Sequence, residues 1–94
     1  MRQADRAKVT KPNEAQAAVE ELFPAVARWV QGYGHIEIGD QESFGFVVRA
    51  LDCGGMIFED NKAETLAEAF VALEKGLRIW FEEQGIDFHQ GEGP

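Results

Sequence analysis

The stretch TLAEAFVALEKGLRIWFEEQ, residues 65–84, has the pattern of one long amphipathic helix. Its large apolar residues recur at spacings of three and four, which places them on one side of a helix. Those residues are Leu66, Phe70, Leu73, Leu77, Trp80 and Phe81. Thr65 and Glu68 form a capping-box pair that predicts the helix start, and Gly85 predicts its end. Because such a stripe must be buried, we expect the rest of the chain to supply the layer that covers it.

A second helical pattern with one apolar side covers residues 13–32. Asn13 is predicted as its N-cap, because Pro12 disfavours an earlier helical residue. Pro24 lies inside the pattern, where it removes a backbone hydrogen bond and clashes with the preceding turn. Since the apolar stripe keeps its phase through Pro24, the sequence favours one kinked helix over two separate helices. Gly32 is expected to end it.

Three segments between these helices have the two-residue alternation of β-strands. They are residues 35–40, 44–52 and 56–59. Apolar residues on both faces of the segment 44–52 indicate a central strand, and the glycines after it supply a tight hairpin turn. The predicted fold is therefore α+β in the order α-β-β-β-α, with a three-stranded antiparallel meander and two helices packed on one face.

The chain of 94 residues carries a net charge of −8, which is unevenly distributed. Residues 1–12 contain four basic residues and one acidic residue, so the remainder carries −11. An acidic domain repels phosphate backbones, and we therefore expect no nucleic-acid partner. We predict a flexible basic arm over residues 1–12, a single domain over 13–85 and a tail over 86–94. The alternation of Ile86 and Phe88 leaves open a fourth edge strand in the tail.

No apolar run approaches the roughly 20 residues of a membrane span, and no signal-peptide pattern is visible. A cytoplasmic protein without a membrane partner is expected. The single cysteine, Cys53, excludes an internal disulfide framework. It stands beside Asp52, whose negative charge disfavours a reactive thiolate.

The order helix, three strands, helix resembles the topology of the double-stranded-RNA-binding domain. That family grips RNA with a lysine-rich cluster at the start of its second helix. The matching stretch here, residues 62–68, has one lysine and two glutamates. The resemblance therefore implies a topology without the RNA-binding function.

The segment from Gly54 to Ala69 resembles the HicB antitoxin family. In that family a meander and a glycine-containing turn lead into a helix that opens with Thr, an acidic residue and Glu-Ala. The segment here has two glycines in the turn and the sequence TLAEA at residues 65–69. The proline-bracketed segment between the family's strands is absent, and so is its separate DNA-binding region. The resemblance implies a module of this shape and supplies no functional residue.

The sequence has no motif for catalysis, metal binding or phosphate binding, so we predict no catalytic residue, cofactor or metal site. His35 and His89 are expected to be surface residues. Several carboxylates near strand ends are expected to form a solvated acidic rim, because they lack the spacing of a calcium loop. They are Asp40, Glu42, Asp52, Glu59 and Asp60.

The open face of the predicted sheet is the candidate interface. If the helices cover the face of Phe44, Phe46 and Val48, the other face presents apolar residues around one arginine. The candidate interface residues are Val47, Arg49, Leu51 and Ile57. A three-stranded sheet also has two unpaired edges, and Val71 and Ile79 lie on the outer side of the long helix. These features predict a homodimer, or contact with another protein.

Two hypotheses of function follow from the sequence. The first is a small acidic protein-interaction module that self-associates, or serves as an accessory subunit, without catalysis. The alternative is a small-ligand-binding domain or enzyme with a pocket between the two helices, lined by Trp29 and Trp80. Both tryptophans lie on apolar helix stripes, which favours packing in the core over a ligand pocket.

Overall fold

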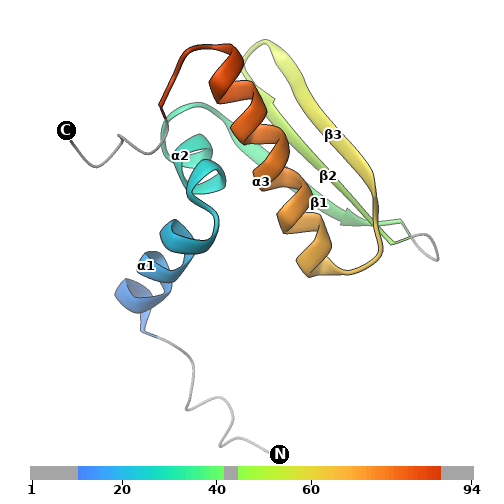
Figure 1. The fold of residues 1–94 in the computed structure, drawn as a ribbon. Helices are drawn as coiled ribbons and strands as arrows, with labels where there is room; N and C mark the ends of the chain where they lie inside the picture. The colour runs from blue at the N-terminus through green and yellow to red at the C-terminus, as the bar shows by residue number, and fades with distance from the viewer. Residues whose placement is uncertain (1–10, 42–44, 88–94) are drawn as a thin grey trace, which may run out of the picture.

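The computed structural model describes residues 11–41 and 45–87, which form three helices and one antiparallel sheet (Figure 1). The elements are α1 (Pro12–Leu22), α2 (Pro24–Gly32), β1 (His35–Asp40), β2 (Phe46–Asp52), β3 (Gly55–Ala63) and α3 (Leu66–Glu83). Their order confirms the predicted α+β class. No helix in these two ranges is long and apolar enough to cross a membrane. Most of the predicted arm, Phe44 and the tail from Phe88 lie outside the described residues.

The sheet has the order β1-β2-β3, so β2 is the central strand, as predicted. β1 pairs with β2 in unbroken antiparallel register along its whole length. β3 is longer than predicted: it begins at Gly55 and continues past Glu59 to Ala63, which pairs with Phe46. A register shift between Phe46 and Val48 lets β3 continue, since one extra residue in a bulge bends the strand without ending its pairing.

The structure has two N-terminal helices where the sequence favoured one kinked helix, so that prediction is wrong. Phe23 separates them with φ −134° and ψ 65°, outside the helical region. A residue before proline is disfavoured in the helical conformation, and Pro24 is well placed as the first residue of α2, where no N–H is needed. The same reason explains why α1 begins at Pro12 with Lys11 as its N-cap, so the predicted Asn13 cap is also wrong.

The long helix α3 begins and ends close to the predicted residues. Thr65 Oγ1 accepts the Glu68 N–H at 3.1 Å. The Glu68 carboxylate accepts the Glu64 N–H at 2.8 Å, whereas in a standard capping box it would accept the N–H of the N-cap residue, Thr65. Gly85 adopts the left-handed conformation with φ 75°, and the Ile86 N–H bonds back into the last turn at 2.8 Å. This turn places Ile86 against the core, and Ile86 is not part of a strand.

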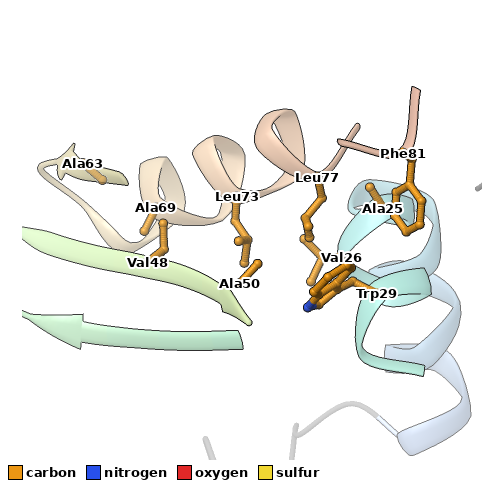
Figure 2. Close-up of a cluster of buried hydrophobic side chains, with 10 residues drawn as sticks. All are labelled: Ala25, Val26, Trp29, Val48, Ala50, Ala63, Ala69, Leu73, Leu77 and Phe81. Carbon is orange, nitrogen blue, oxygen red and sulfur yellow. The ribbon is translucent and has the colours of Figure 1, made fainter. Parts of the chain in front are cut away.

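α2 and α3 lie on one face of the sheet and enclose the core (Figure 1). Leu73 points from α3 toward Ala50 of β2, and Leu77 points toward Val26 and Trp29 of α2 (Figure 2). α3 lies against β2 and β3, whereas α2 lies against α3 and β1. α1 contributes no buried residue to this core.

A buried carboxylate joins the two core helices. Glu74 of α3 is 6% exposed, and its two oxygens accept the backbone N–H groups of Ala25 and Val26, each at 3.0 Å. Arg78 Nε donates to the same carboxylate at 2.8 Å. The first N–H groups of a helix have no partner within the helix, and the helix dipole favours a negative charge there. Glu74 therefore caps α2 from a neighbouring helix.

We expect Glu74→Gln to lower the free energy of unfolding by about 2–3 kcal/mol, because the amide offers one acceptor oxygen and turns an NH₂ group toward the second backbone N–H. Urea denaturation followed by circular dichroism measures this change. Glu82→Gln, the same substitution at an exposed position of α3, should change the value by less than about 0.5 kcal/mol. An unchanged midpoint for Glu74→Gln would show that the fold does not depend on this cap.

Gly76 lies where α3 packs closely against Phe58 of β3. A Cβ atom at this position would overlap the Phe58 ring of β3. Glycine inside a helix is less favourable than alanine by about 1 kcal/mol. The contact with Phe58 gives a packing reason for this glycine.

Gly76→Ala should lower the free energy of unfolding by about 1–3 kcal/mol, because the clash outweighs the gain in helix propensity. Gly32→Ala is the matched control, since a Cβ atom there meets nothing within 4 Å. That variant should be as stable as the parent or more stable by up to about 1 kcal/mol. Thermal unfolding compares the two, and equal stability of both variants would contradict tight packing of Phe58 on α3.

Candidate interaction surfaces

The face of the sheet opposite the helices carries three of the predicted interface residues. Val48 and Ala50 are fully buried on the helix side of β2. Because side chains alternate along a strand, Val47, Arg49 and Leu51 point to the open side. All three are half-buried.

Arg49 is held on this open face by carboxylates from both neighbouring strands. Its Nε donates to Glu59 of β3 at 2.6 Å, and its Nη1 donates to Glu37 of β1 at 3.4 Å. The hydrogen bond and the charge of Glu59 raise the pKa of Arg49, and Glu37 adds a smaller effect in the same direction. Strand register places the three residues in one row across the sheet. The row ties the strands together and leaves no unpaired positive charge at Arg49.

Ile57 does not share this open face in the way the sequence predicts. Phe58 pairs with Ala50 and Met56 pairs with Leu51, so Ile57 is the extra residue of a bulge. Its side chain packs against the core. The structure thus separates Ile57 from Val47 and Leu51, and a role of Ile57 in an interface stays a prediction. Met56, which is 53% exposed, lies opposite Leu51 instead.

Aromatic rings occupy the space between α2 and α3. Trp29 is fully buried, and its indole N–H donates to the His35 carbonyl at 3.0 Å. Its ring meets the Trp80 ring edge-on at 5.1 Å and stacks on Tyr33 at 5.9 Å. Phe81 completes the group, with its ring 6.3 Å from Trp29. Trp29 is therefore a core residue, held by its neighbours and by one hydrogen bond.

Trp29→Phe should lower the free energy of unfolding by about 1–3 kcal/mol, because it removes the indole hydrogen bond and leaves a cavity. Trp80→Phe should have a smaller effect, since Trp80 is only half-buried. Chemical denaturation of the two variants makes the comparison. A Trp29→Phe variant as stable as the parent would contradict its place in the core.

A groove of about 400 Å³ lies between β3 and α3. Its apolar lining includes Ala63, Ala72 and Val71, and Val71 is 45% exposed. Lys62 and Lys75 also line it, together with two carboxylates, and neither lysine forms an ion pair within the described residues. Such a groove has the chemistry to hold a small ligand with one anionic group and a short apolar part.

α1 leaves its apolar side outside the core. It extends from α2 away from the sheet (Figure 1), and none of its residues is buried. Val19 is 44% exposed and Leu22 is 64% exposed. Ala15 and Ala18 lie on the same side of the helix. The sequence predicts this stripe but gives no sign that the break at Phe23 turns it away from the core.

The remaining candidate residues stay apart. His35 is exposed, with its Nε2 3.9 Å from a Glu37 carboxylate oxygen, and Cys53 is exposed in the hairpin between β2 and β3. No group of three or more His, Cys, Asp or Glu residues close enough to hold a metal occurs within residues 11–41 and 45–87. His89 and Glu42 lie outside those ranges.

Three hydrogen bonds engage the buried Glu74 carboxylate, and the sequence pattern did not single it out. It lies at the border of the apolar stripe of α3, where a glutamate looks like an ordinary surface residue. Its partners are backbone groups of Ala25 and Val26, which are 49 and 48 residues away in the chain, respectively. No local motif signals such a contact.

Comparisons of this chain with protein-family models, curated proteins and solved structures find no match. The resemblances to the double-stranded-RNA-binding domain and to the HicB family therefore stay predictions from the sequence.

Proposed function

We propose that this protein is a non-catalytic protein-interaction module that works as a homodimer. The observation that supports it most strongly is the uncovered apolar side of α1, defined by Ala15, Ala18, Val19 and Leu22. α1 has 11 residues, none of them buried. Isolated helices shorter than about 12–15 residues are marginal in water, so an amphipathic helix of this length gains most of its stability from packing.

Other apolar side chains outside the core support the same proposal. Val30 of α2 is 46% exposed, Leu66 at the start of α3 is 48% exposed, and Ile79 on its outer side is 55% exposed. Burying apolar surface stabilises an association by about 25 cal/mol per Å² before the costs of association. A second copy that covers α1 supplies such burial.

The charge of the chain opposes association and therefore gives it a salt dependence. Each copy carries −8, so two copies repel each other at low ionic strength. Salt screens this repulsion, with a Debye length of about 10 Å at 0.1 M. The homodimer should therefore become tighter as salt is added, in contrast to an association held by ion pairs.

Leu22→Glu tests the proposal, because it places a charge on the uncovered side of α1. We expect the parent protein to sediment as a dimer and Leu22→Glu to shift toward monomer, with a dissociation constant raised about tenfold or more. Native mass spectrometry measures the oligomeric state of each protein, and analytical ultracentrifugation measures the dissociation constant. The melting temperature of the monomer should change little, since Leu22 is 64% exposed.

Ala17→Glu is the matched control, because it adds the same charge to the opposite side of α1. This variant should keep the affinity of the parent within a few fold. A parent protein that is monomeric across the micromolar range would overturn the homodimer. Equal weakening by both variants would show that charge, and not the apolar side of α1, controls association.

Ligand binding in the groove between β3 and α3 is the second candidate function. Lys62 and Lys75 favour it, because neither forms an ion pair with a described residue, whereas the Asp60 and Glu68 carboxylates of the groove already accept the backbone N–H groups of Lys62 and Glu64. The same native mass spectra test it. A reproducible added mass that is lost in Lys62→Gln or Lys75→Gln would support this candidate, and spectra without added mass would count against it.

A further inference from the structure

We propose that the homodimer forms by antiparallel pairing of β1 with β1 of a second copy, which joins the two sheets into one. This inference rests on the proposed function and specifies its interface. It concerns the sheet edge formed by Ile36, Glu37, Ile38, Gly39 and Asp40. Apart from its ladder with β2, this edge makes no backbone hydrogen bond to another described residue.

The two edges of the sheet differ in how well they are protected. β3 has two register shifts and carries Lys62, and both features hinder pairing with another strand. β1 has unbroken register with β2 and contains neither lysine nor proline. Its one central charge, Glu37, is engaged by Arg49 on the open face. β1 is thus the edge suited to accept a further strand.

Gly39 gives an independent reason to place a second backbone at this edge. Glycine weakens a strand, and inside one it marks a bulge, a bend or the close approach of another chain. The register of β1 with β2 is unbroken through Gly39, which excludes a bulge. A Cβ atom there would meet only Val47 Cγ1 at 3.8 Å, an ordinary contact. A single copy therefore has no steric need for glycine at this position.

Among two-fold axes at Ile36, Glu37 and Ile38, the axis at Ile38 fits the residues of β1 best. An axis at Glu37 would place two glutamates directly opposite each other, which is unfavourable. An axis at Ile36 would use the start of β1, where the His35 carbonyl already accepts the Trp29 indole N–H. An axis at Ile38 places Ile38 opposite Ile38 of the second copy and Glu37 opposite Gly39. This register gives the Glu37 side chain the space that the glycine leaves.

The helix layer is consistent with pairing at β1. α3 covers β2 and β3, whereas α2 is the helix beside β1, and α1 continues from α2 (Figure 1). Ile36 and Ile38 remain half-buried on the helix side of β1. A second copy paired at β1 therefore lies on the side of the fold from which α1 extends. There it can cover both the isoleucines and the apolar side of α1.

A pair of charge variants at one position tests this interface. Gly39→Glu places a glutamate opposite Glu37 of the second copy at two symmetry-related contacts, whereas Gly39→Lys places a lysine there. We expect the dissociation constant of Gly39→Glu to exceed that of Gly39→Lys by about tenfold at low salt, and the difference to shrink at high salt. Analytical ultracentrifugation measures both, and equal constants would overturn the pairing at β1.

Disulfide cross-linking tests the register directly. Ile38→Cys in a Cys53→Ser background should give a covalent dimer under mild oxidation, because residues directly opposite in an antiparallel pair have Cα atoms about 4.5–5.5 Å apart. Leu51→Cys in the same background, on the open face, is the control and should stay uncrosslinked. Circular dichroism shows whether each variant folds. If Ile38→Cys does not fold, the dissociation constants of the two Gly39 variants decide whether the dimer pairs at β1.

The outcomes separate this inference from the proposed function. A dimer that cross-links through Leu51→Cys and not through Ile38→Cys would overturn pairing at β1 and leave the homodimer in place. A chain that is monomeric in every variant and in the parent would overturn both. Cross-linking through Ile38→Cys alone, with the predicted effect of charge at Gly39, would support both.

Discussion

The carboxylate of Glu74 fixes the relation between the N-terminal helices and the rest of the fold. By accepting the N–H groups of Ala25 and Val26, it supplies from α3 the hydrogen bonds that the start of α2 lacks. A buried charge is favourable only when it is paired and hydrogen-bonded, and Arg78 together with the helix dipole meets that condition. This contact and the packing of Trp29 against Trp80 and Phe81 together hold α2 against α3.

The break before Pro24 explains why α1 stands apart. Pro24 disfavours a helical conformation at Phe23, and the start of α2 faces Glu74, so α1 does not continue in a straight line into α2. The apolar side of α1 then loses the layer that covers the equivalent side of α2. Phe23 itself packs on Phe70 of α3, with ring centroids 5.4 Å apart. The fold thus gains a firm junction between two helices and leaves a third with an uncovered apolar side, which is the surface we assign to a second copy.

The two faces and two edges of the sheet have different chemistry. One face is closed by α2 and α3, and the other carries the row of Glu37, Arg49 and Glu59, in which the one positive charge is paired within the chain. β3 is bent by bulges and carries a lysine, whereas β1 is regular. These differences come from single residues. The extra residue of each bulge protects the β3 edge, whereas Gly39 leaves space at the β1 edge.

The periodicity of the sequence was enough to predict the class of the fold, the long helix α3, the strand β1 and the central place of β2. These features depend on local spacing and on caps such as Thr65 and Gly85, which act within a few residues. The length of β3, the bulge at Ile57 and the role of Glu74 required the folded structure, because each depends on contacts between residues far apart in the chain. The break at Phe23 has a local cause in Pro24, but the phase of the apolar stripe favoured a kink, and only the folded structure decided between a kink and a break.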